Sequence, residues 1–219
     1  MNDVRKTITH LVLNNEHAFK IVGSEGFRKW CKLLQPQFIV PSQRTIAKDC
    51  YALYLSEKLK LKTFLKTDCN WIALTRACWT SMQNLSYLVI VAYSIDNDRK
   101  YHKRIICFTL ISNKKEDTIE SKVEKVLTGW GISNVSIVAS ESEFSMEGRF
   151  LDTYRNSSSP RMAEVLICTQ SWLKPSLVDI KDLKLVETLF QNMTIEAGTC
   201  GASGSSAAGG APPAAGRTI

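Results

Sequence analysis

The side chains best able to bind a metal or attack a substrate are the seven cysteines and three histidines of this 219-residue chain. The cysteines are scattered and never form a C-x-x-C pair, and no histidines stand beside two cysteines, so the sequence lacks the spacing of a zinc site. The sequence also lacks the G-x-S-x-G, G-x-x-x-x-G-K-[ST] and H-E-x-x-H motifs. We therefore predict free or buried thiols in a reducing compartment, no cofactor and no metal site.

Carboxylates are the other candidates for chemistry. Metal-dependent cleavage of a phosphodiester uses clustered carboxylates that hold two divalent cations about 4 Å apart and activate a water. Glu141 and Glu143 lie close together in S-E-S-E-F-S, whereas L-T-R-A-C-W-T-S carries Ala77 and no acidic residue. The number of carboxylates near these two segments decides whether the chain can hold such cations.

Six long motifs resemble the plant hAT-type transposases of the ricesleeper-like group. The resemblance covers residues 25 to about 132 and then 135 to 173. The motifs are EGFRKW (25–30), IVPSQRTIAKDCYALYL (39–55), WTSMQNLSYL (79–88), HKRIICFTLIS (102–112), VEKVLTGWGI (123–132) and ESEFSMEGRFLD (141–152). Full-length members of this group also carry a BED-type zinc finger, whose Cys and His spacing does not occur in this sequence.

The resemblance implies three catalytic acids, of which one is present. In the family the first acid stands at the end of the first strand in L-T-T-D-x-W-T-S, where this chain has Ala77. The second acid belongs to a V-D-N-A-S segment that this sequence lacks, and the third matches Glu141. Because a methyl group cannot bind magnesium and one carboxylate cannot hold two metals, we expect an internally truncated, catalytically inactive transposase derivative.

The apolar periodicity predicts a mixed α/β chain of the α+β type. Strands are expected at 71–75, 87–95 and 104–111, which are rich in β-branched and aromatic residues, with a last strand at 135–138. Helices are expected at 25–34, 43–65, 117–128, 160–173 and 179–193. Ser42 is the predicted start signal of the second of these helices, and Ser159 with Pro160 that of the fourth. A capping box formed by Ser140 and Glu143 predicts the start of a further helix before residue 159.

The resemblance implies a partial RNase H-like sheet of three or four strands flanked by helices, followed by a helical C-terminal dimerisation block. Because a sheet of only three or four strands leaves unpaired backbone N–H and C=O groups along its border, we expect an exposed edge that favours self-association. The expected regions are a helical segment at 1–66, a truncated RNase H-like core at 67–134, the dimerisation block at 135–176, an amphipathic helix at 177–196 and a disordered Gly/Ala/Ser/Pro tail at 197–219.

An apolar stripe in the dimerisation block is the expected interface. A small domain cannot fully cover this stripe by itself, so we expect a homodimer or pairing with a related hAT protein. For Trp172 the sequence favours two roles about equally: an anchor in the dimer interface, or a residue of the core. The expected dimerisation residues are Phe144, Leu151, Met162, Val165, Leu166, Trp172 and Leu173.

Basic residues give the chain a net charge of +7, which is compatible with contact to nucleic-acid phosphates. The simpler interpretation is that these residues lie on solvated faces. No apolar run is long enough for a membrane span, and the resemblance implies a nuclear location. The nucleic-acid candidates are Arg44, Lys48, Lys58, Lys60, Lys62, Arg99, Lys100, Lys103 and Arg104.

Three functional hypotheses follow. The leading one is a catalytically inactive protein that acts through dimerisation, with non-specific DNA binding as a further property. The alternatives are a DNA-binding remnant of a hAT transposase and a gene relic whose product has no selected activity.

Overall fold

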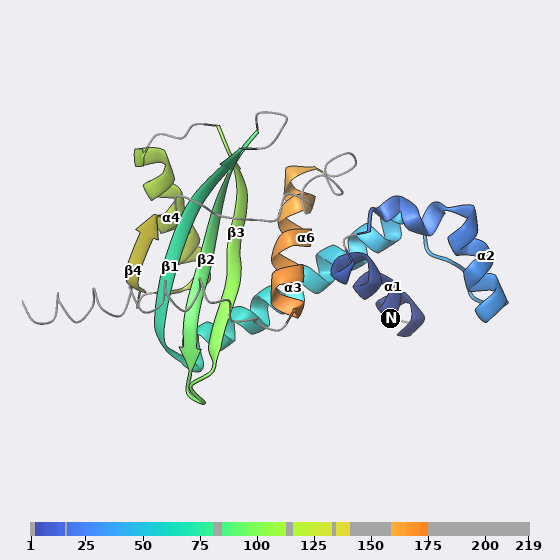
Figure 1. Ribbon diagram of the computed structural model, residues 1–219, viewed down its shortest axis with the longest axis horizontal. Helices are drawn as coiled ribbons and strands as arrows, with labels where there is room; N and C mark the ends of the chain where they lie inside the picture. Colours follow the sequence, from blue (N-terminus) through green and yellow to red (C-terminus); the bar gives the residue numbers. More distant parts are fainter. Residues whose placement is uncertain are drawn as a thin grey trace, which may run out of the picture. The chain divides into compact units, whose positions relative to one another are not determined.

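The computed structural model describes residues 3–15, 17–80, 85–112, 116–132, 135–140 and 159–174. These residues all lie in the first of two compact units, Met1–Asp179. The expected capping box at Glu143, the helix at 179–193 and the tail at 197–219 lie outside the described residues. In chain order (Figure 1) the elements are α1 (Asp3–Asn14), η1 (Phe19–Gly23), α2 (Glu25–Leu34), α3 (Gln43–Thr67), β1 (Cys69–Thr80), β2 (Ser86–Asp96), β3 (Tyr101–Ile111), α4 (Glu116–Trp130), β4 (Val135–Ser140) and α6 (Pro160–Leu173).

The described strands form one four-stranded sheet with the order β3-β2-β1-β4. The first three strands are antiparallel neighbours, and β4 returns beside β1 in the parallel direction after helix α4. Figure 1 shows the long strands β1, β2 and β3 side by side, with the short β4 next to β1. This arrangement confirms the α+β fold and the expected fourth strand.

The strands are longer than the sequence predicts. The segment expected at 71–75 is part of β1, which continues to Thr80, and β3 begins at Tyr101 rather than at Arg104. The C-terminal end of β1 stays extended because it pairs residue by residue with β2, from Ala77 opposite Val89 to Thr80 opposite Ser86. Backbone pairing with the neighbouring strand, and not the residue types of β1 alone, sets where the strand ends.

The helix boundaries follow local signals. Ser42 and Ser159 accept hydrogen bonds from the backbone N–H of Thr45 (3.2 Å) and Met162 (3.4 Å), which confirms both predicted caps. Helix α4 ends at Trp130 and is followed by Gly131, which has a φ of 69°. In this conformation the Gly131 N–H donates to the Thr128 carbonyl, and the Ile132 N–H donates to the Leu127 carbonyl. Ser140, expected to cap a helix, is instead the last residue of β4.

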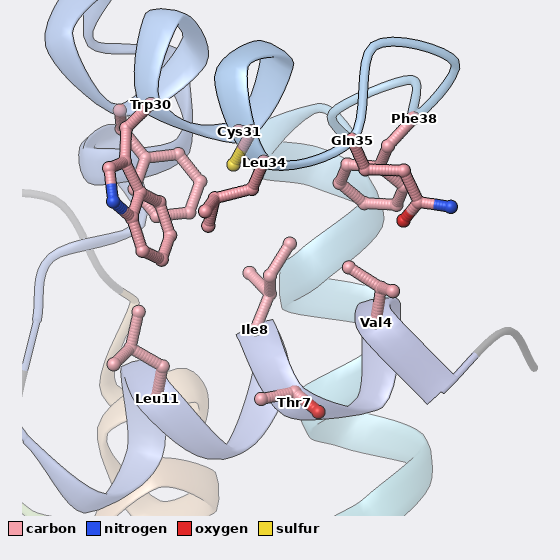
Figure 2. Close-up of a pocket in the computed structure, with 10 residues that line it drawn as sticks. Val4, Thr7, Ile8, Leu11, Trp30, Cys31, Leu34, Gln35 and Phe38 are labelled. Atoms are coloured by element: carbon pink, nitrogen blue, oxygen red, sulfur yellow. The ribbon is translucent and has the colours of Figure 1, made fainter.

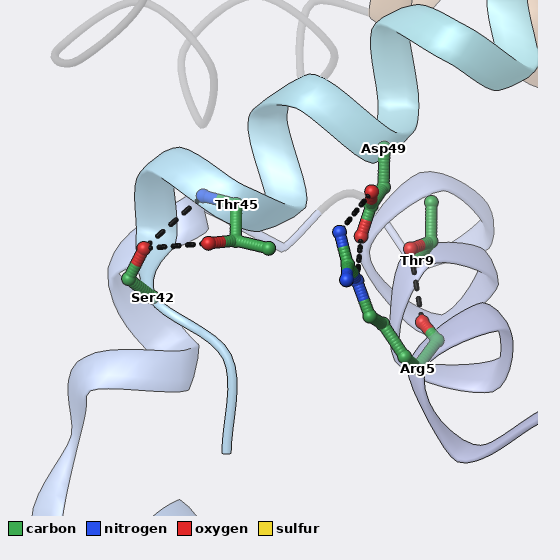
Figure 3. Close-up of polar contacts among 5 residues, drawn as sticks. All are labelled: Arg5, Thr9, Ser42, Thr45 and Asp49. Carbon is green, nitrogen blue, oxygen red and sulfur yellow. Dashed lines mark hydrogen bonds and ion pairs between the residues drawn. The ribbon is translucent and has the colours of Figure 1, made fainter. Parts of the chain in front are cut away.

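An ion pair fixes the N-terminal helix on α3. The carboxylate of Asp49, a buried residue of α3, accepts two hydrogen bonds from the Arg5 guanidinium of α1, the second at 2.6 Å (Figure 3). The hydrogen bond and the negative charge of Asp49 raise the pKa of Arg5. The two parallel hydrogen bonds restrain the orientation of α1 on α3.

Candidate functional site

Ala77, where the resemblance implies the family's first acid, is buried in the sheet and carries only a methyl group. Ala77 is 6% exposed and lies within β1 rather than at its end. The neighbouring parallel ladder ends where Arg76 pairs with Ser140, directly before Glu141. Glu141 itself lies outside the described residues. Within the described ranges, no group of three or more His, Cys, Asp or Glu side chains could hold a metal ion.

The expected dimerisation helix α6 is part of the core of this chain. It packs against β3 and α3, as Figure 1 shows for its position along the sheet. Val165, Leu166 and Trp172 are buried, and Met162 and Leu173 are half-buried. Phe144 and Leu151 lie outside the described residues. Helix α3 and strand β3 therefore cover much of this stripe, including Val165, Leu166 and Trp172.

Trp172 is the centre of this contact. Its ring stacks on Tyr54 of α3 with 5.2 Å between centroids and meets the Trp130 ring of α4 edge-on at 5.9 Å. Its indole N–H donates to the Ile105 carbonyl of β3 at 2.8 Å. One side chain thus joins α3, α4, α6 and the sheet, which identifies Trp172 as a core residue of the monomer.

The edge of the sheet at β3 is blocked by side chains. The strand bulges at Ile106, and the Trp130 indole N–H donates to the carbonyl of that residue at 3.0 Å. The N–H of Ile105 donates to the Ser171 hydroxyl at 3.1 Å, and Lys122 donates to the Leu110 carbonyl at 2.8 Å. Bulges and occupied backbone groups prevent a strand from pairing with another sheet. The edge of β3 is thus partly covered between Ile105 and Leu110.

Most of the predicted nucleic-acid residues make contacts within the chain. Six of them have contacts of this kind. On α3, Lys58 lies over the Tyr54 and Trp130 rings (5.5 and 5.3 Å), Lys60 pairs with Glu57 (2.7 Å) and Lys62 donates to the Gly129 carbonyl (2.9 Å). In and after the β2–β3 turn, Lys100 pairs with Asp98 (3.5 Å), Lys103 lies over Tyr93 (5.7 Å) and Arg104 donates to the Lys103 carbonyl (3.0 Å). Arg44 and Lys48 are exposed on α3, and Arg99 is exposed in the turn with a φ of 63°.

Two of these cations meet in a hollow between α3 and β3. The hollow has a volume of about 220 Å³ and brings Lys60 and Arg104 together with His102, Phe64 and Trp172. Burial lowers the pKa of Arg104. The His102 ring nitrogen lies 2.8 Å from an Asp96 carboxylate oxygen, and this hydrogen bond lowers the pKa of Asp96. These residues come from segments that are distant from one another in the sequence, and the fold brings them together.

The described cysteines are free thiols, as predicted. Burial raises the pKa of Cys50 and Cys107 to about 12. Because the thiolate is the nucleophile, such thiols are unreactive at neutral pH.

An uncharged groove between α1 and α2 was not anticipated as a site. Ten residues from α1, α2 and the segment after α2 line this groove, which has a volume of about 330 Å³. Figure 2 shows Val4, Ile8 and Leu11 of α1 facing Trp30 and Leu34 of α2 across it. The helical period of α2 was visible in the sequence, but it indicated only that the helix has one apolar face. In the structure Trp30 is 56% and Leu34 66% exposed, because α1 covers only part of that face.

Comparison with known proteins agrees with this architecture. The family model of the ZBED1 RNase-like domain matches residues 75–165, which places an RNase-like domain over β1 to α6. Over 128 residues the chain is 27% identical to the zinc finger BED domain-containing protein RICESLEEPER 2 of Oryza sativa subsp. japonica, covering 58% of this chain and 18% of that protein. It is 28% identical to the zinc finger BED domain-containing protein DAYSLEEPER of Arabidopsis thaliana over 58% of this chain and 18% of the relative.

A putative AC transposase of Zea mays is 32% identical over 55% of this chain and 15% of the relative. The chain is thus a distant homologue of plant hAT AC transposases and of the ricesleeper and daysleeper BED zinc finger proteins over about 58% of its length. It spans less than a fifth of the length of these relatives. No solved structure matches the chain. Within the described residues, no helix is long and apolar enough to cross a membrane.

Proposed function

We propose that this chain is a catalytically inactive hAT transposase derivative that acts in the nucleus through protein association. The observation that carries the proposal is Ala77, a buried methyl group at the position of the family's first catalytic acid. Two-metal cleavage needs several carboxylates in one place. If the chain does not cleave DNA, its function depends on what its surface binds.

The proposed partner is a second copy of the chain or a related hAT protein. The apolar stripe of α6, which the resemblance associates with dimerisation, is occupied by α3 and β3. Association through that stripe would require α6 to leave the core. An apolar surface outside the core is therefore the better candidate, since contiguous exposed apolar groups commonly mark interaction sites.

Nuclease assays test the loss of catalysis. Purified chain incubated with magnesium or manganese should leave labelled transposon ends uncut, because Ala77 provides no ligand for the first metal. Glu141→Gln serves as the matched variant. Metal-dependent cleavage that Glu141→Gln abolishes would contradict the proposal, since Glu141 would then be a working ligand.

DNA binding is a second candidate function, favoured by the hollow that contains Lys60, His102 and Arg104. We expect only weak binding without sequence preference, because most of the predicted nucleic-acid residues are engaged in internal contacts and phosphate contacts alone carry no sequence information. Affinity measured by fluorescence anisotropy should fall steeply as salt rises. Lys60→Ala with Arg104→Ala should weaken binding uniformly across sequences. A clear preference for one duplex over shuffled controls at physiological salt would contradict this expectation.

A further inference from the structure

A hollow beside α2 has one charged wall and one largely apolar wall. Its volume is about 480 Å³. The charged wall comes from α2, where four residues stand at the spacing of a single helical face, and the second wall comes from the segment between α2 and α3 (Figure 1). The lining residues are Glu25, Arg28, Lys29 and Lys32 of α2, followed by Pro36, Gln37, Phe38, Ile39 and Val40.

The charged wall carries an excess of positive charge. Its three cations and one carboxylate give a net charge of +2. Lys29 pairs with Glu25 at 2.8 Å, but both side chains are largely exposed, and exposed pairs of this kind exchange partners at little cost. Neither Arg28 nor Lys32 has an ion pair with a described residue. The wall therefore favours an acidic ligand.

The second wall presents apolar side chains to the same space. Ile39 is 89% exposed, more than any other large hydrophobic residue of the described chain, and Phe38 and Val40 are half-buried. Phosphate groups of a nucleic acid bind cations but gain little from an aliphatic side chain. A ligand that carries both carboxylates and apolar groups matches both walls.

The backbone of the second wall is extended and has groups available for pairing. Residues 38–42 belong to no helix or strand, and Pro41 restricts the preceding Val40 to an extended conformation. Within the described residues, the backbone groups of Ile39 and Val40 form no hydrogen bond. Such a segment can accept a second extended chain through backbone hydrogen bonds.

We propose that this hollow binds an acidic, extended segment of another protein, in which carboxylates alternate with apolar side chains. Successive side chains of an extended peptide point to opposite sides, so one side can direct carboxylates toward α2 while the other places apolar groups beside Ile39. The inference rests on the proposed function, protein association, and adds to it the chemistry of a partner segment.

Binding of defined peptides tests the proposal. The probes are fluorescein-labelled octapeptides in which Asp or Glu alternates with Val, Ile, Leu or Phe, measured by fluorescence anisotropy at physiological salt. Because the contact is small, we expect a dissociation constant on the order of 10 μM for the best of them. Counterparts with Lys in place of the acids, or Ser in place of the apolar residues, should bind at least about 10-fold more weakly.

Two variants with matched controls locate the site. Lys32→Glu should weaken peptide binding at least about 5-fold, whereas Lys48→Glu, which changes the net charge equally on an exposed lysine outside the hollow, should stay within about 2-fold of wild type. Ile39→Ser should weaken binding to a similar extent, and Leu59→Ser on α3 should not. All four side chains are exposed, so the circular dichroism spectrum and the unfolding midpoint should not change. Amide hydrogen exchange at Ile39 and Val40 should slow in the complex.

Several results would overturn the proposal. Equal losses in Lys32→Glu and Lys48→Glu would mean that peptide binding reports only the general charge of the chain. A single-stranded oligonucleotide that binds where the acidic peptides do not, with affinity lowered by Lys32→Glu and unchanged by Ile39→Ser, would assign the hollow to phosphate groups. Absence of peptide binding in a wild-type chain that self-associates in sedimentation equilibrium would remove this site and leave protein association standing. Absence of both would remove the proposed function as well.

Discussion

Trp172→Ala is expected to destabilise the folded chain by about 3–5 kcal/mol, the usual range for removing a buried tryptophan. The substitution removes the stacking on Tyr54, the edge contact with Trp130 and the hydrogen bond to the Ile105 carbonyl. Since small domains have free energies of unfolding of about 5–15 kcal/mol, the substitution should remove a large fraction of the stability of the folded chain. Urea denaturation followed by circular dichroism measures the change.

Two comparison variants make this result specific. Trp172→Phe keeps most of the apolar packing and loses the indole N–H, so it should destabilise the chain by only about 1–2 kcal/mol. Leu59→Ala changes an exposed side chain and should stay within about 0.5 kcal/mol of wild type. If Trp172→Ala instead keeps wild-type stability and loses only self-association, Trp172 is an interface anchor and α6 is a dimerisation surface. Absence of a cooperative unfolding transition in wild type would favour the gene-relic hypothesis.

Ala77→Asp is expected to lower the free energy of unfolding by about 3 kcal/mol at neutral pH, since it puts an unpaired charge at a buried position. The effect should depend on pH. In the unfolded chain the new carboxyl ionises near pH 4, while burial raises its pKa in the folded chain. The folded form then binds the proton more strongly, so the destabilisation should be small at acidic pH and grow as pH rises through the folded pKa.

Urea denaturation at acidic and neutral pH tests this prediction, with Ala77→Ser as the small polar control. The serine variant should lose less stability because its hydroxyl carries no charge. Magnesium should not restore the stability of Ala77→Asp, since one carboxylate at this position does not make a two-metal site. Stabilisation of Ala77→Asp by low magnesium concentrations would mean that further ligands surround the position, which would argue against an inactive derivative.

Local signals in the sequence determined the elements and their order. Ser42, Ser159 and Pro160 marked helix starts because their side chains satisfy or avoid free backbone N–H groups within the same turn. The apolar strands and the returning strand before Ser140 indicated the α+β sheet. The expectation that Ala77 stands in place of an acid came from the sequence resemblance alone, and the structure adds only that the position is buried.

Only the tertiary structure decided which apolar surfaces are covered. Periodicity identifies an apolar face without naming its partner, so the α6 stripe and the α2 face looked alike in sequence. In the fold, α3 and β3 bury Trp172, whereas α1 leaves Trp30 and Leu34 partly exposed. The same holds for Lys58 and Lys62, whose internal partners are distant in the chain. Burial and pairing between distant segments depend on the packing of whole elements, which no local pattern encodes.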